Sequence, residues 1–243
     1  LLKKIKEKKF DKIFIFNSSI KYLLLAKLAG IKSINQYPLF LRKNNIVLTA
    51  RELIQNSIQE NISTQPVLHL SRDKIEKAKN KYKFDSSFRH ICFGFSASGP
   101  TKRWPIEKYM KLAENMNKIK PCKFYLAGGR NDEELFTKFL NSSIASNCIS
   151  FKDLSISETL PIIKNCDMYI GNDTGWLHIA SALDKKCVAL FMDTPVKAYG
   201  KYSKNILVIV PEGETEETTT HDTLGKDKIN FEKVLNKSLE TLG

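Results

Sequence analysis

The chain has 243 residues, a formal net charge of +13 and 42% hydrophobic residues. This length allows one large or two small domains, and the hydrophobic content supports a real core. No run approaches the ~18 apolar residues of a membrane span and no secretory signal opens the chain, which predicts a soluble protein. No Cys-x-x-Cys pair occurs, so we interpret the cysteines as reduced core thiols of a cytoplasmic protein; they are Cys92, Cys122, Cys148, Cys166 and Cys187.

The positive charge comes mostly from lysine and is densest in residues 1–12 and 74–83. No zinc-finger or RRM-like motif accompanies it, and the lysines lack interleaved aromatic residues, so nucleic acid is not an expected partner. Attraction to an anionic membrane surface carrying a phosphorylated glycolipid fits the charge better. A lysine-rich proteome is the alternative explanation.

The first part of the chain is predicted to contain both helices and strands. The expected elements are a helix at 1–9, a strand at 12–16, a helix at 20–29, a short strand at 33–36, and helices at 49–58 and 74–83. We expect a domain boundary near residues 85–89, which gives an N-terminal domain with linker over 1–86 and a C-terminal domain over 87–243. Because a doubly wound domain normally opens with a strand, we expect its first strand or two to precede Leu1.

From residue 91 onward, predicted strands and helices alternate regularly. The expected strands are 91–95, 123–127, 149–151, 168–170, 187–191 and 206–210, and the expected helices are 106–118, 132–140, 157–165, 175–183 and 230–242. This alternation predicts a parallel sheet with helices on both faces, in a Rossmann-like domain. Ligands of such sheets bind beyond the carboxyl ends of the strands.

A loop with small hydroxyl residues follows the predicted strand 91–95. Ser96, Ser98 and Gly99 allow a ligand to approach the backbone closely, and Lys102 supplies a flexible positive charge. Pro105 is well placed as the first residue of the next helix. The loop therefore resembles a phosphate-binding loop, although a solvated turn before a helix is the better explanation when the segment is taken alone.

A second loop, Gly-Asn-Asp-Thr-Gly at 171–175, joins the predicted strand 168–170 to an amphipathic helix. The first backbone N–H groups of such a helix are unpaired and lie at the positive end of the helix dipole, so they suit an anionic group such as phosphate. In the alternative interpretation, Asp173 or Thr174 only caps the helix and the glycines only make the turn.

Together the two segments resemble glycosyltransferase family 9, the ADP-heptose:lipopolysaccharide heptosyltransferases. The resemblance rests on Ser-Gly-Pro-Thr-Lys-Arg-Trp-Pro at 98–105 and Gly-Asn-Asp-Thr-Gly-Trp-Leu-His at 171–178, and residues 10–15 and 24–30 are also similar to the family's N-terminal half. It implies an α/β protein of GT-B architecture with two Rossmann-like domains. The N-terminal one, over 1–86 with its linker, is the incomplete acceptor-side domain, and the C-terminal one, over 87–243, binds the nucleotide sugar.

The resemblance also implies a reaction. It is inverting transfer of heptose from ADP-heptose to a lipid-linked acceptor, the inner core of lipopolysaccharide, at the inner face of the cytoplasmic membrane. In the family the proposed catalytic base is the Asp of a Gly-Asp loop after the first strand. Nothing here matches that loop, so we expect the base upstream of Leu1, and this stretch of chain is expected to bind ADP yet transfer poorly.

Family roles carry over to several residues of this chain. The resemblance implies that the diphosphate is bound by Ser96, Ser98, Lys102 and the backbone N–H groups of Thr174 and Gly175. Asp173 would orient the loop or contact the sugar, and His178 would contact the donor. Family members often have Pro where this chain has Trp176, which places a bulky indole beside the donor sugar.

Two further residues match the nucleoside part of the family's site. Glu133 would accept the hydroxyls of the ribose, although an acidic residue in the first turn of a helix is an equally good explanation. Leu154 would lie against the adenine, in a loop where Ser155 and Glu158 form a capping-box pattern. The sequence has no metal-binding cluster, and neither a metal nor another cofactor is expected.

Two other classes of protein stay open. One is an enzyme of the same architecture that does not transfer, such as a UDP-sugar 2-epimerase. The other is a non-catalytic relative that binds a nucleotide sugar and has lost its base.

Overall fold

The computed structural model describes residues 1–39 and 45–243. Contacts divide the chain into a small unit, Leu1–Thr64 with Lys197–Tyr202, and a large unit, Gln65–Val196 with Ser203–Gly243. Residues 65–86 thus lie with the large unit, whereas the sequence prediction grouped them with the N-terminal domain. The division into an acceptor-side and a nucleotide-sugar-binding domain stays a prediction.

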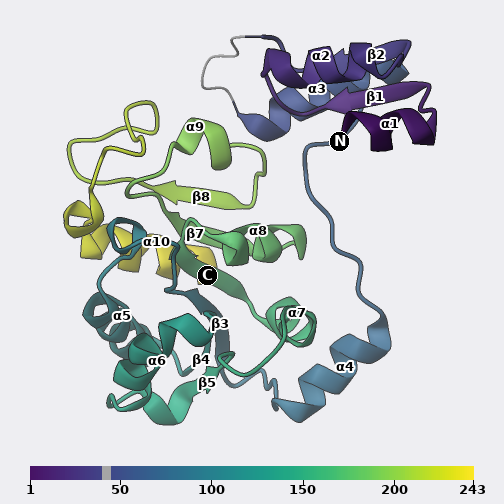
Figure 1. Ribbon diagram of the computed structural model, residues 1–243. Coiled ribbons are helices and arrows are strands. Elements are labelled where there is room, and N and C mark those ends of the chain that lie inside the picture. The colour runs from purple at the N-terminus through teal and green to yellow at the C-terminus, as the bar shows by residue number, and fades with distance from the viewer. Residues whose placement is uncertain (40–44) are drawn as a thin grey trace. The chain divides into compact units, whose positions relative to one another are not determined.

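The small unit is built around two short parallel strands (Figure 1). Its elements are α1 (Leu2–Lys8), β1 (Lys12–Ile15), α2 (Ile20–Leu28), β2 (Ser33–Gln36) and α3 (Ile46–Ile58). Strand β1 pairs with β2 in parallel, and Ile15, Ala26 and Ile31 form a small buried core between the strands and α2.

Side-chain caps fix where the helices of the small unit begin. Ser19 Oγ accepts a hydrogen bond from Lys21 N at 3.3 Å, so this serine is the N-cap of α2. Helix α3 begins at Ile46 rather than at the predicted Thr49. Its earlier start follows from Asn45, whose Oδ1 accepts hydrogen bonds from the backbone N–H groups of the first turn.

The large unit contains a six-stranded sheet in which every pair of neighbours is parallel. Its strands are β3 (Arg89–Gly94), β4 (Cys122–Leu126), β5 (Cys148–Ser150), β6 (Met168–Asn172), β7 (Lys186–Leu190) and β8 (Ile206–Ile209). The spatial order is β5-β4-β3-β6-β7-β8. This is the order of a Rossmann fold, in which the direction of winding reverses between β3 and β6.

Helices cover both faces of this sheet (Figure 1). The helices of the large unit are α4 (Arg72–Lys81), α5 (Ile106–Ile119), α6 (Glu133–Leu140), α7 (Ile156–Asn165), α8 (Gly175–Ala182) and α10 (Phe231–Leu242), whereas α9 (Val196–Tyr199) belongs to the small unit from Lys197 onward. Helix α5 packs against α6 and α10 on one face, and α7 packs against α8 and α4 on the other. The short helix α9 is absent from the sequence prediction.

The core of the large unit lies on both sides of the sheet, so its strands are almost continuously apolar. Phe93, Phe124 and Tyr109 are fully buried on the α5 side, where they pack edge to face and tilted against one another. This packing fixes the carboxyl ends of the central strands. None of the helices in the described ranges has the length and apolar character of a membrane span.

Candidate functional site

The two motif loops begin side by side at the switch point of the sheet. Strand β3 ends at Gly94 and pairs there with Gly171 of β6. The hydroxyl of Tyr169 lies so close to both glycines that an added Cβ would be 1.8 Å from it at Gly94 and 2.5 Å from it at Gly171. Glycine is therefore required at both positions to let the buried tyrosine fit beneath the loops.

One buried amide, that of Asn172, ties the two loops together. Asn172 Nδ2 donates to Phe95 O at 2.8 Å and to Ser96 O at 3.3 Å. Asn172 Oδ1 accepts from Tyr109 Oη at 3.0 Å and from Trp104 N at 3.3 Å. Burial raises the pKa of Tyr109 well above its ordinary value, so the hydroxyl stays a donor. This network was missed in the sequence, because it depends on which strands are neighbours.

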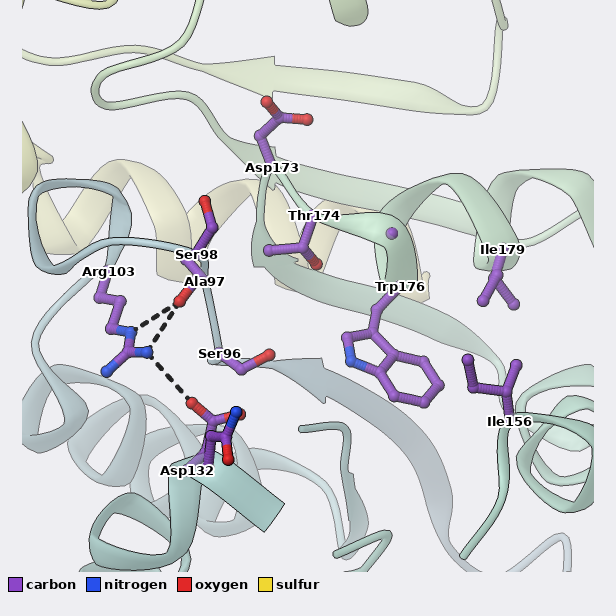
Figure 2. A pocket seen from close by; sticks show the side chains of 12 residues that line it. Ser96, Ala97, Ser98, Arg103, Asp132, Ile156, Asp173, Thr174, Trp176 and Ile179 are labelled. Carbon is purple, nitrogen blue, oxygen red and sulfur yellow. Dashed lines mark hydrogen bonds and ion pairs between the residues drawn. The ribbon is translucent and has the colours of Figure 1, made fainter. Parts of the chain in front are cut away.

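The loops enclose a pocket of about 540 Å³, which we name pocket A (Figure 2). Its lining residues are Ser96, Ala97, Ser98, Arg103, Asn131, Asp132, Ile156, Asp173, Thr174, Gly175, Trp176 and Ile179. Five predicted site residues, Ser96, Ser98, Asp173, Thr174 and Gly175, thus come together at one place. Arg103 and Asp132 lie on one side of the view, Ile156 and Ile179 lie on the other, and the indole of Trp176 lies between them (Figure 2).

Arg103, which the sequence analysis did not select, supplies a positive charge to pocket A. Its Nε and Nη2 donate to Ala97 O at 3.0 and 2.8 Å, and Nη2 lies 3.2 Å from Asp132 Oδ1. The other carboxylate oxygen of Asp132 accepts from Gly129 N at 3.0 Å. These contacts hold the guanidinium in place through Nε and Nη2.

The start of α8 faces pocket A with its backbone. Thr174 is the N-cap residue, yet its side chain makes no capping hydrogen bond. Asp173 Oδ1 instead lies 3.5 Å from His178 Nε2. The interpretation in which Asp173 or Thr174 only caps the helix therefore lacks its expected contact, and the geometry suits an anion bound at the helix N-terminus.

Gly175 has no strained backbone. Its φ is outside the left-handed region, and an added Cβ would meet nothing within 4 Å. A side chain at position 175 would therefore meet no unfavourable backbone angle. A side chain there would extend from the first residue of α8 into open space at pocket A.

A second pocket of about 450 Å³, which we name pocket B, adjoins the first. It is lined by Gly128, Gly129, Lys152, Asp153, Leu154, Ser155, Ile156, Glu158 and Trp176. Leu154 thus lies apart from the other predicted site residues, in a pocket that shares Ile156 and Trp176 with pocket A. The predicted capping box is confirmed, since Ser155 N donates to Glu158 Oε2 at 2.8 Å and Glu158 N donates to Ser155 Oγ.

Three predicted site residues line neither pocket. Lys102 lies in the short helix η1 (Pro100–Lys102), directly before Arg103. Glu133 begins α6 and forms an ion pair with Lys152, which raises the pKa of that lysine through the hydrogen bond. His178 lies in α8 beside Asp173. Across residues 1–39 and 45–243, no three His, Cys, Asp or Glu side chains are grouped as metal ligands.

The family model of glycosyltransferase family 9 (heptosyltransferase) matches residues 34–227, and the chain therefore belongs to this family. A curated relative is lipooligosaccharide heptosyltransferase 2 of Haemophilus ducreyi, 28% identical over 78% of this chain and 56% of the relative. Another is lipopolysaccharide heptosyltransferase 2 of Escherichia coli, 23% identical over 77% of this chain and 61% of the relative. The chain thus spans little more than half the length of these proteins.

Solved structures share the fold. The ADP-heptose lps heptosyltransferase II of E. coli has a TM-score of 0.72 and 22% identity, over 99% of this chain and 79% of that one. The E. coli heptosyltransferase WaaC with ADP has a TM-score of 0.69 and 14% identity, over 99% of this chain and 75% of that one. The predicted fold class, α/β with parallel sheets and GT-B architecture, is confirmed.

Proposed function

We propose that the protein transfers heptose from ADP-heptose to a lipid-linked inner-core saccharide of lipopolysaccharide, and that pocket A binds the donor's diphosphate. The observation that carries the proposal is the meeting of two loops, remote in sequence, around one pocket at the switch point of the sheet. The relatives named above are heptosyltransferases, and one was solved with ADP.

Negative charge grows on the leaving diphosphate as the bond to the sugar breaks. Donors already aimed at that position lower the barrier most. We assign Ser96, Ser98 and the backbone N–H groups of Thr174 and Gly175 to this task, since all four residues line pocket A. Arg103 adds a fixed positive charge, and Lys102 adds a flexible one from the neighbouring helix η1.

The rest of the donor is assigned to the flanking residues. Leu154 in pocket B would contact the adenine. The carboxylate of Glu133, which forms an ion pair with Lys152, would instead accept hydrogen bonds from the ribose hydroxyls when the donor binds. Asp173 and His178, which lie 3.5 Å apart at the start of α8, would contact the sugar.

The acceptor and the location of the protein follow from the proposed reaction. A lipid-linked acceptor lies at the inner face of the cytoplasmic membrane, and the net charge of +13 favours peripheral contact with anionic lipid there. Both the membrane contact and the cytoplasmic location stay predictions.

Titration calorimetry with ADP and UDP, followed by a mass-spectrometric assay of heptose transfer to a lipid-linked inner-core acceptor, tests the proposal. We expect ADP to bind more tightly than UDP, and we expect the acceptor to gain heptose efficiently only when the assayed chain carries the Gly-Asp loop with the expected base. Preference for UDP with turnover of the donor alone would contradict the proposal in favour of an epimerase-like enzyme. ADP binding without transfer by a chain that carries this loop would indicate a non-catalytic binding protein.

A further inference from the structure

Trp176 and Ile156 are the two residues common to the linings of pockets A and B. Pocket A carries the charged groups of Arg103 and Asp132, whereas the junction between the pockets is apolar. A ligand that fills both pockets must therefore pass this pair of side chains. An uncharged surface at that point does not suit phosphate.

The pair is built to present apolar surface. Trp176 packs beside the buried ring of Phe151, with ring centroids 6.2 Å apart and an interplanar angle of 50°, so its indole is supported by the core. Ile156 is the first residue of α7 and stays 60% exposed, although a polar residue at that position would cost nothing. An exposed isoleucine beside a supported indole resembles an uncovered binding surface.

We infer that Trp176 and Ile156 form the surface on which the nucleoside of the donor packs, so that Trp176 determines nucleoside affinity rather than lying beside the donor sugar as the resemblance implied. The inference rests on the proposed function, because it takes the diphosphate to lie at the start of α8. From there the nucleoside reaches pocket B across the indole. A nucleobase or ribose packs well on an aromatic face, and base stacking on an aromatic side chain stabilises nucleotide complexes.

Calorimetry with adenosine, AMP and ADP on the whole chain tests this inference. For Trp176→Ala we expect affinity to fall about tenfold, the scale of one stacking contact, and by the same factor for all three ligands. Ile156→Ala should give a smaller fall of the same kind, and Trp176→Phe should restore most of the affinity. Ile119→Ala is the matched control, since Ile119 is 56% exposed at the far end of α5 and should change nothing.

Tryptophan fluorescence gives a readout that a merely structural role would not change. The chain has two tryptophans, and Trp104 is 1% exposed, so a nucleoside can contact only the indole of Trp176. We expect adenosine to quench the fluorescence emission of the unsubstituted protein, the parent, and not that of Trp176→Phe. Unchanged adenosine affinity in folded Trp176→Ala, or a loss confined to ADP-heptose, would overturn the inference while leaving the proposed function standing. Failure of the parent to bind any adenine nucleotide would overturn both.

Discussion

The two ends of the six-stranded sheet use polar side chains in opposite ways. At the carboxyl end, Arg103, Asp132 and Asp173 line an open pocket. At the amino end, polar groups of similar kind bond to one another and are covered. His90 is buried there, with Nδ1 2.9 Å from Tyr125 Oη and its backbone N–H donating to Asp167 Oδ2 at 2.7 Å.

The amino end is closed further by aromatic packing. Phe84 stacks on Tyr125 with ring centroids 4.9 Å apart and an interplanar angle of 4°. Burial raises the pKa of Tyr125, so its hydroxyl remains protonated. His90 is thus part of the core. Polar groups at this end stabilise the fold.

The direction of the helices explains the difference. Helices α5 and α8 begin at the carboxyl end, so their unpaired N–H groups and positive dipole ends gather there. Small residues in the loops keep that end open, whereas the amino end is filled by Phe84 and Tyr125. We therefore expect changes at the carboxyl end to alter affinity and changes at the amino end to alter stability.

Asn172 lies at the carboxyl end, yet we expect its substitution to lower both stability and affinity. It is the substitution with the largest expected effect. Asn172→Ala removes the amide that bonds to the buried groups Phe95 O and Trp104 N, and it leaves Tyr109 Oη with the longer contact to Gly94 O at 3.4 Å. We expect the free energy of unfolding to fall by about 3 kcal/mol or more, and ADP affinity to fall with it. Urea denaturation and calorimetry measure the two quantities. A loss of stability below about 0.5 kcal/mol would show that the amide does not join the loops.

Substitution of Arg103 tests the expectation that changes at the carboxyl end alter ligand affinity. Arg103→Ala should weaken ADP binding by about 1.5–3 kcal/mol, the range for a hydrogen bond to a charged group, and should leave adenosine binding unchanged. Lys102→Ala is the comparison, with a smaller expected loss because Lys102 does not line pocket A. Calorimetry with ADP and adenosine measures both. A larger loss for Lys102→Ala than for Arg103→Ala would reverse the assignment of the main cation.

Substitution of Tyr125 tests the expectation that changes at the amino end alter stability, and the expected effect is smaller. Tyr125→Phe removes the hydroxyl that bonds to His90 Nδ1 and leaves a buried ring nitrogen without that partner. We expect a loss of about 1–2 kcal/mol in the free energy of unfolding and no change in ADP affinity. Weaker ADP binding by the folded variant would mean that the two ends are coupled, contrary to the comparison drawn above.

Much of the fold was predictable from sequence because each element carries its own signal. Alternating apolar runs and helical periodicity indicated the parallel sheet, and the two glycine-containing loops marked its functional end. Local caps shifted some boundaries, as Asn45 did for α3. The short helix α9 has too few residues for a periodic pattern to appear.

The choice between two adjacent cations was not predictable. Lys102 ends the helix η1, whereas Arg103 has an extended backbone with φ −108° and ψ 113°. This change of conformation decides which side chain lines pocket A, and no propensity of either residue indicates it. The partners of Arg103, Ala97 O and Asp132, come from separate loops that only the folded sheet brings together.

Thermal melting of Gly175→Ala and Gly175→Val, with and without saturating ADP, tests the central claim that the start of α8 binds the diphosphate. Because nothing lies within 4 Å of an added Cβ, the melting temperature without ADP should stay close to that of the parent. A side chain there would obstruct the approach of phosphate to the backbone N–H groups, so the rise in melting temperature caused by ADP should shrink, most of all for Gly175→Val. A rise as large in Gly175→Val as in the parent would contradict the claim.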